Sequence, residues 1–248
     1  MTPQSWSASQ PLILAEPERP FWGFSELFLV GALFLPAVLA GEFAVRGATA
    51  YFHGDAAAGS ALLAAEFIAY AIVFIALRFL FARHGEPLFR SLGWVDFPFR
   101  PVHLMITGFV LALAVVVLGS LLRLPNVETP FDKLLSDPFS RIAIGLFGVT
   151  LGPIIEELLF RGFLQPVLVS TIGVLPGILS TSVLFGVMHL AQNAGIWQSG
   201  LLITLVGFVL GVIRHLSGST RASSIVHMSY NALPFFVLIF SGDPNSHK

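Results

Sequence analysis

Two adjacent carboxylates and an arginine lie in a long apolar part of the sequence. Between Ile142 and Ile213, the only ionisable acid or base side chains other than histidine are Glu156, Glu157 and Arg161. An ionised group at the centre of a bilayer costs about 2.5–3.5 kcal/mol on insertion scales. Packing alone does not explain two neighbouring glutamates in such a run, so we expect them to do chemistry.

The spacing of these three side chains separates their roles. Glu157 and Arg161 are four residues apart, so on a helix they share one face and can form an ion pair. Glu156 points about 100° away around the helix and lacks that partner. It is therefore free to act as a general base. In the alternative interpretation, both glutamates bind Arg161 and only brace the helices.

Two histidines and an asparagine occur in later apolar stretches. His189 follows Phe185 by four residues, and His227 precedes Asn231 by four. Taken singly, His189 is typical of a satisfied core histidine, and the His227 pair is typical of hydrogen bonding between membrane helices, at about 0.6 kcal/mol per side chain. Together with the glutamates, however, three apolar segments each carry a carboxylate or an imidazole. This pattern predicts one polar cavity, open to water, inside a helical bundle.

Such a cavity would hold the groups needed to hydrolyse a peptide bond within a membrane. Glu156 and His189 would hold and deprotonate a water molecule, while His227 and Asn231 would stabilise the tetrahedral intermediate. The set Glu156, His189 and His227 also suits a zinc ion that keeps one coordination position open for water. The residue types alone do not choose between a metal-free and a zinc-dependent reaction.

Other intramembrane protease chemistries lack their motifs in this sequence. There is no cysteine, no His-Glu-x-x-His and no Gly-x-Ser-x-Gly, which are the patterns of thiol, zinc and serine hydrolases. No apolar stretch contains a pair of aspartates. The glutamate and the histidines are thus the candidates for catalysis.

The elements that must position these residues are membrane-spanning helices. The 248-residue chain is 55% hydrophobic and 11% charged, with a mean hydropathy of +0.84, whereas soluble domains carry about 25% charged residues. A helix needs about 20 apolar residues to cross a bilayer. We therefore predict an all-α, polytopic transmembrane bundle of about seven spans, or eight if one long segment is broken, at residues 22–45, 59–82, 102–123, 142–168, 173–191, 199–214 and 222–240. The net charge of −1 gives no electrostatic support for nucleic-acid binding.

The domain plan and the orientation follow from the polar segments. Residues 1–21 are predicted to be a polar tail without a cleavable signal pattern, and residues 22–248 a single transmembrane domain. The connection at residues 78–100 carries four arginines against two acids, so the positive-inside rule places it in the cytoplasm together with the N-terminus, Arg214 and Arg221. Short loops favour a bacterial plasma membrane as the location.

The order of the motifs resembles the CPBP family of intramembrane proteases, which includes the CAAX prenyl endopeptidase and the bacterial Abi proteins. The resemblance covers about residues 138–236, the expected protease core. It rests on three motifs in separate apolar stretches: Glu156-Glu157-x-x-x-Arg161, Phe185-x-x-x-His189 and His227-x-x-x-Asn231.

This resemblance implies the same roles for these residues as their types and spacing do. Glu156 and His189 would activate the water, His227 and Asn231 would form the oxyanion site, and the Glu157–Arg161 pair would be structural. The family is described both as metalloproteases and as glutamate-dependent enzymes without a metal, so zinc stays an alternative cofactor.

The sequence thus predicts an intramembrane endopeptidase that cleaves a membrane-associated protein, with a prenylated CAAX-type protein among the candidate substrates. Two other classes compete with it. One is a non-catalytic membrane adaptor or bacteriocin-immunity protein that uses the same cavity for binding. The other is a proton-coupled transporter, against which the lack of an inverted repeat counts.

Overall fold

The apolar helices predicted from the sequence are present in the structure, a computed structural model that describes residues 19–52, 58–125, 127–129, 132, 134–135 and 137–240. Within these ranges every regular element is a helix, which confirms the all-α prediction. In chain order the helices are α1 (Phe24–Tyr51), α2 (Ala58–Arg83), α3 (Leu88–Ser91), α4 (Pro101–Leu121), α6 (Pro138–Val149), α7 (Leu151–Glu157), the π-helix η1 (Leu158–Leu164), α8 (Gln165–Ile172), α9 (Val174–Met188), α10 (Trp197–Ser217) and α11 (Thr220–Phe240).

Five segments of the described chain are long and apolar enough to cross a membrane. They are Phe24–Tyr51, Gly59–Arg83, Pro101–Leu121, Pro138–Ile172 and Trp197–Ser217. Each coincides with a predicted span. The fourth is the longest: its backbone leaves the helical region at Thr150 (φ −121°, ψ −87°), and it continues through α7 and the π-helix η1.

The two remaining predicted spans are helical but differ from a typical membrane span. Residues 173–191 form α9, which has only 15 residues. Residues 222–240 lie in α11, which has 21 residues and is not among the candidate spans found in the described part of the chain. These two helices carry or adjoin the predicted site residues His189 and His227.

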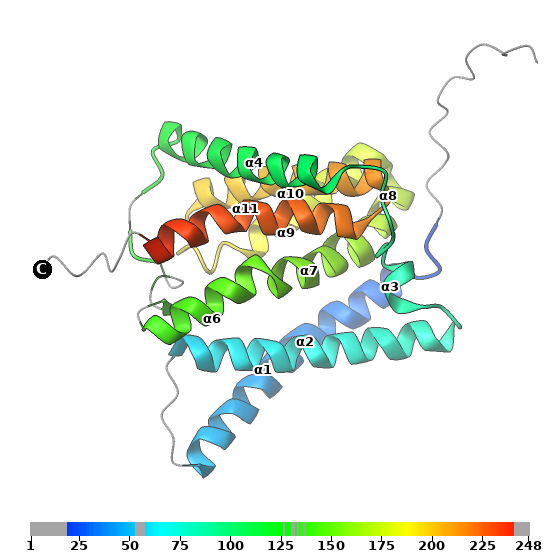
Figure 1. Ribbon diagram of the computed structural model, residues 1–248. Coiled ribbons are helices and arrows are strands. Elements are labelled where there is room, and N and C mark those ends of the chain that lie inside the picture. The colour runs from blue at the N-terminus through cyan, green and yellow to red at the C-terminus, as the bar shows by residue number, and fades with distance from the viewer. Residues whose placement is uncertain are drawn as a thin grey trace, which may run out of the picture.

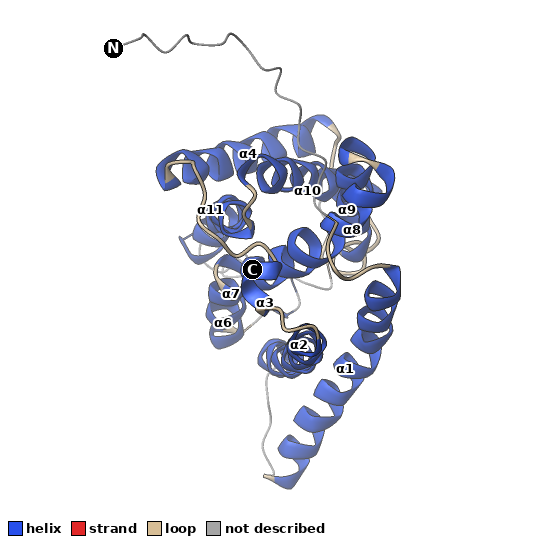
Figure 2. Cartoon of the chain, turned by 90° about the vertical axis from the view of Figure 1, so that its right-hand side faces the viewer, coloured by secondary structure: helices blue, strands red, loops and turns tan. Residues whose placement is uncertain are grey.

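The helices form a stacked bundle from which α1 diverges. In Figure 1, α4, α11, the α6–α7 segment and α2 lie one below another with similar directions. Helix α1 crosses α2, and its far end leaves the bundle, as Figure 2 shows from the side. Helix α11 packs chiefly against α4, and α10 packs chiefly against α9. The segment that carries the two glutamates therefore runs through the middle of the molecule, between α11 and α2.

Two buried apolar clusters hold this arrangement. The first joins α1, α2 and α3 to η1 through side chains that include Trp22, Phe81 and Phe163. The indole Nε1 of Trp22 also donates a hydrogen bond of 2.9 Å to the carbonyl oxygen of Phe163 within the π-helix. The second cluster joins α4, α10 and α11, and includes Leu210 and Val226. The first cluster includes Leu158 and packs against Ile154, so it directly contacts the glutamate-bearing segment.

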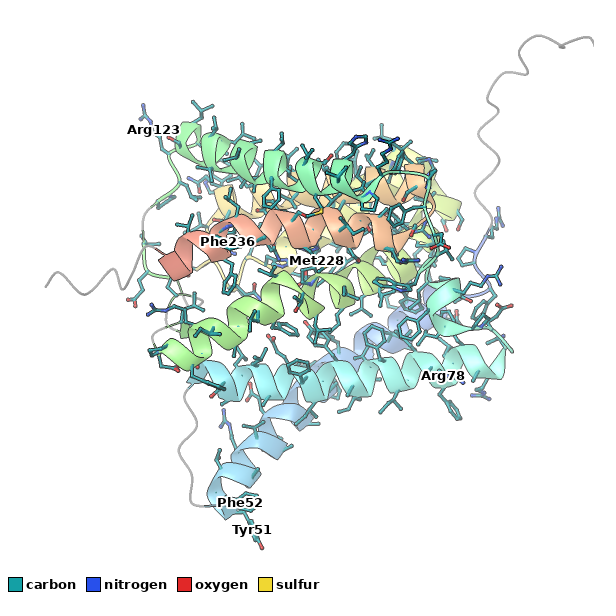
Figure 3. All side chains as sticks on the ribbon, in the orientation of Figure 1. Tyr51, Phe52, Arg78, Arg123, Met228 and Phe236 are labelled. Atoms are coloured by element: carbon teal, nitrogen blue, oxygen red, sulfur yellow. The ribbon has the colours of Figure 1, made fainter. Side chains whose placement is uncertain are left out.

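One end of the bundle collects the arginines that were predicted to share a membrane side. Arg221 forms an ion pair with Asp96, and the backbone N–H of Thr220 donates to the carbonyl of Gly93 at 2.8 Å. The α2–α4 connection and the start of α11 therefore lie together. Figure 3 shows Arg78 toward this end and Arg123 at the opposite one. That this end is cytoplasmic stays a prediction, and most of the predicted tail, residues 1–18, lies outside the described residues.

Candidate active site

A cavity of about 640 Å³ opens inside the bundle, and the predicted site residues line it. Its walls come from α2, α6, α7, α9, α10 and α11, so segments far apart in the sequence meet there. Its polar lining side chains are Glu66, Tyr70, Glu156, His189, Gln192, Asn193, His227, Tyr230 and Asn231. The four predicted catalytic side chains are thus brought together in one polar cavity.

The predicted ion pair forms across the junction of α7 and the π-helix. Arg161 Nη1 lies 3.0 Å from Glu157 Oε1, and both side chains are fully buried. Arg161 Nη2 donates a 3.0 Å hydrogen bond to the carbonyl of Gly207 on α10. The guanidinium also lies over the Phe185 ring, 4.4 Å from its centroid. Arg161 therefore neutralises Glu157 and joins η1 to α9 and α10.

Glu157 also contacts one of the histidines, which the sequence pattern did not predict. His227 Nδ1 lies 3.1 Å from Glu157 Oε1, and the imidazole is almost completely buried. A carboxylate beside Arg161 can only accept hydrogen bonds. The Nδ1 atom of His227 therefore carries the hydrogen and donates a hydrogen bond to Glu157. The opposite ring nitrogen, Nε2, is thereby directed toward Glu156, 3.7 Å from Oε2. Glu157 thus orients His227 in addition to pairing with Arg161.

His189 is oriented by the backbone of its own helix. Its Nδ1 lies 2.7 Å from the carbonyl oxygen of Phe185, one turn earlier. A carbonyl accepts hydrogen bonds, so Nδ1 donates and the neutral ring keeps an unprotonated Nε2. That Nε2 lies 3.9 Å from Glu156 Oε1. The Phe185 ring, 4.5 Å from the imidazole between centroids, packs against the same ring.

Glu156 lies between the two histidines and keeps access to the cavity. Its two carboxylate oxygens are 3.9 Å from His189 Nε2 and 3.7 Å from His227 Nε2, and 26% of its side chain is exposed. Both distances are too long for direct hydrogen bonds and leave room for a bridging water. Among the described residues, the ion pair of Arg161 is with Glu157 and not with Glu156. The bracing interpretation, in which both glutamates bind the arginine, is therefore not what the structure has.

Asn231 lies one helical turn after His227, as the spacing predicted. Its Nδ2 donates a 2.7 Å hydrogen bond to the carbonyl of Gly148 on α6. A carboxamide carries two N–H groups, so the bond to Gly148 fixes the side chain while one N–H stays available toward the cavity. The amide is held in place between α11 and α6.

Two further polar side chains of the cavity were missed in the sequence. Glu66 and Tyr70 lie on α2, four residues apart, and both line the cavity opposite α7. The signal was present, because Glu66 is the single acid in the apolar run 59–82. An ionisable residue inside a membrane span is a functional candidate by default.

The ligand set considered for zinc was Glu156, His189 and His227. In the parts of the chain that the structure describes, no three histidine, cysteine, aspartate or glutamate side chains are arranged to hold a metal ion. The Nδ1 atoms of both histidines are engaged, with Phe185 and Glu157, so each ring offers Nε2. Histidines that bind zinc commonly have their other ring nitrogen hydrogen-bonded in this way, so these two contacts suit the metal-free and the zinc-dependent reaction alike.

The position of His189 depends on close packing between α9 and α10. An added Cβ at Gly186 would lie 2.6 Å from the Gly200 carbonyl oxygen and 3.1 Å from the Thr204 nitrogen. Small residues allow membrane helices to approach closely in this way. We expect Gly186→Ala to lower the free energy of unfolding by about 1–3 kcal/mol through overpacking, and to reduce activity by shifting His189.

Thermal unfolding in detergent micelles measures this effect, with Gly31→Ala as the control. An added Cβ at Gly31 meets nothing within 4 Å, and alanine is a better helix former than glycine by up to about 1 kcal/mol. The control should keep or raise the melting temperature. Equal behaviour of the two variants would contradict the packing assigned to α9.

Comparison with known proteins finds a family match over the segment that carries this site. Residues 138–233 match a family model described as type II CAAX prenyl endopeptidase Rce1-like. No curated protein and no solved structure matches the chain. The predicted resemblance to the CPBP family is confirmed. The matched segment contains Glu156, His189, His227 and Asn231, whereas Glu66 on α2 precedes it.

Proposed function

We propose that this chain, which carries an Rce1-like domain of the type II CAAX prenyl endopeptidase family at residues 138–233, hydrolyses a peptide bond of a membrane-associated protein with Glu156 as the general base. One observation carries the proposal: a partly exposed carboxylate lies 3.7 and 3.9 Å from two oriented imidazoles in a cavity inside an apolar bundle. Positioned groups of this kind contribute about 10²–10⁴-fold each to a proton-transfer step.

The reaction begins with a water molecule held between Glu156 and His189. The Nε2 atom of His189 accepts one hydrogen bond from the water, and Glu156 accepts the proton as the oxygen attacks the scissile carbonyl carbon. The carbon–oxygen double bond becomes a tetrahedral oxyanion. Glu156 then returns the proton to the leaving amine as the carbon–nitrogen bond breaks, so atoms and charges balance.

His227 and Asn231 stabilise the oxyanion. Asn231 offers the N–H that is not engaged with Gly148. His227 already donates from Nδ1 to Glu157, so donation from Nε2 to the oxyanion requires the imidazolium form. The buried carboxylate of Glu157 supports that cation. Preorganised donors of this type are worth about 10²–10³-fold in turnover.

Replacing His189 isolates its contribution. We expect His189→Ala to lower kcat by about 10²–10⁴-fold, because the water loses the acceptor that aligns it with Glu156. His103→Ala on the exposed side of α4 is the matched control and should leave kcat unchanged. Steady-state cleavage of one peptide substrate by the two variants measures the difference. A His189→Ala enzyme as active as the control would remove His189 from the mechanism.

A chelator tests the zinc alternative. With Glu156 as base and no metal needed, prolonged incubation with a strong zinc chelator should leave the cleavage rate within about twofold, and metal analysis should find less than one ion per chain. This expectation rests on the geometry of the described residues, among which no three histidine, cysteine, aspartate or glutamate side chains are arranged to hold a metal ion. Loss of activity that only added zinc restores would establish the metal-dependent reaction instead.

The function itself is tested with purified protein and membrane-embedded peptides. The library should contain prenylated CAAX-type peptides, the same peptides without the lipid, and apolar transmembrane segments. New peptide termini found by mass spectrometry support the endopeptidase. Binding without cleavage that is unchanged by Glu156→Ala would identify an adaptor or immunity protein. Proton-coupled uptake in liposomes, with no cleavage, would identify a transporter.

A further inference from the structure

The charge of the cavity is set in part by Glu66, which lies outside the family-matching segment. This residue is partly buried on α2 and lines the cavity together with Glu156. Packing holds α2 against α6: the Phe67 ring meets the Phe147 ring edge-on at 5.1 Å, and Tyr70 stacks on the same ring at 6.4 Å. These ring contacts hold the helix that carries Glu66 against α6.

Glu66 has no partner for its charge in the described part of the chain. None of the described residues forms an ion pair or a hydrogen bond with its carboxylate. The described residues that line the cavity include no lysine and no arginine. The nearby Arg161 forms its ion pair with Glu157, donates to the Gly207 carbonyl and packs on the Phe185 ring.

The cavity is therefore apolar in most of its lining and acidic at two points. Glu157 is neutralised by Arg161, and Glu156 faces the imidazoles of two histidines, so Glu66 is the carboxylate of this cavity that lacks a basic partner among the described residues. An intramembrane carboxylate without a partner is costly, and such groups are normally paired. A bound segment that brings a cation would supply the missing partner, whereas one that brings a carboxylate would be repelled.

We propose that Glu66 is a specificity-determining residue that makes this cavity select an apolar peptide segment bearing a lysine or arginine side chain near the cleaved bond. The same charge disfavours segments that place an acidic side chain or a free C-terminal carboxylate beside Glu66. This inference rests on the proposed function and names its substrate class. It concerns recognition, so it can be tested by binding as well as by cleavage.

The test uses otherwise identical fluorescent apolar peptides in detergent micelles. Each carries a single lysine, glutamine or glutamate, scanned over the positions around the cleaved bond. Binding is measured by fluorescence anisotropy, and kcat/KM is measured by product analysis. In the wild-type protein, the best-placed lysine peptide should bind about tenfold more tightly than its glutamine counterpart, and the glutamate peptide more weakly than both.

Three variants separate the role of Glu66 from general effects of charge. Glu66→Gln should abolish the preference, so that the lysine and glutamine peptides bind equally tightly. Glu66→Lys should reverse the order and favour the glutamate peptide. The control Glu42→Gln removes an acid on α1 that pairs with Arg46 outside the cavity, and it should keep the wild-type preference.

The two proposals fail in different ways. A wild-type protein without preference for lysine, or a preference that Glu66→Gln retains, overturns the selection by Glu66 even if every peptide is cleaved. A lysine preference in binding that depends on Glu66, with no peptide cleaved, supports the selection and overturns the endopeptidase.

Discussion

Replacing Glu156 with glutamine should lower the rate of peptide cleavage by about 10²–10⁴-fold while leaving the protein folded. Glutamine has nearly the same shape but does not accept a proton from the attacking water. The side chain is partly exposed and lies 3.7 and 3.9 Å from its neighbouring imidazoles, so few contacts are lost. Substrate binding should change little, and the loss should appear in kcat.

The measurement is single-turnover cleavage with enzyme in excess, accompanied by thermal unfolding of the same preparation. The Glu42→Gln variant is the control, because it removes an acid from the exposed side of α1. If Glu156→Gln cleaves at the wild-type rate, another residue must be the general base. A variant that loses activity only because it unfolds would show a lowered melting temperature, and we expect no such decrease.

The second large effect is expected when Glu157 is replaced, and it is an effect on the stability of the fold. Glu157→Gln leaves Arg161 fully buried without its carboxylate. Removing one partner of a buried ion pair costs about 3–5 kcal/mol, because the other charge stays desolvated. His227 also loses the negative charge of the acceptor for its Nδ1–H, because glutamine offers only a neutral amide oxygen. We expect a large drop in the free energy of unfolding together with a loss of activity.

A second substitution separates these two consequences. Glu157→Gln combined with Arg161→Met removes the stranded charge, and replacing a buried pair with apolar side chains is often neutral or stabilising. The double variant should recover most of the stability. It should not recover activity, because Nδ1 of His227 no longer faces a carboxylate.

Unfolding in mixed detergent micelles measures both variants, and the exposed pair of α1 provides the control. Glu42 and Arg46 have the same four-residue spacing, but their side chains are 42% and 79% exposed. Breaking such a pair costs at most about 1 kcal/mol. Equal losses for Glu157→Gln and Glu42→Gln would show that burial does not matter at this site. Full activity in the double variant would remove the orienting role of Glu157.

Most of the site could be predicted because polar side chains in an apolar, membrane-spanning sequence must lie where they avoid lipid. Glu156, His189 and His227 lie on separate helices, and the cost of exposing each to lipid favours a shared interior cavity. The four-residue spacing of Glu157 and Arg161 predicted their ion pair. These inferences use only local geometry and the solvent, so they did not depend on the details of packing.

The features that were not predicted arise from contacts between helices. Regular α-helical geometry does not foresee the π-helix at Leu158–Leu164, which Trp22 contacts through the carbonyl of Phe163. The contact between Glu157 and His227 joins residues 70 positions apart. The role of Glu66 depends on which face α2 turns toward α6, and the nearly uniform hydrophobicity of that helix does not indicate this face.

Five of the seven predicted spans qualify by length and hydropathy among the described residues. Of the other two, α9 has only 15 residues, and α11 is not among the candidate spans found there. These two helices carry or adjoin the proposed catalytic side chains: His189 follows α9, and His227 and Asn231 lie within α11.

The most direct test of the central claim is single-turnover cleavage of a membrane-embedded peptide in water enriched in ¹⁸O. If Glu156 activates water, the wild-type protein forms two fragments, and the new carboxyl terminus carries one oxygen from the solvent. Glu156→Gln forms neither fragment in the same time. A folded wild-type protein that leaves every peptide intact, or a Glu156→Gln variant that incorporates the label at the wild-type rate, would contradict it.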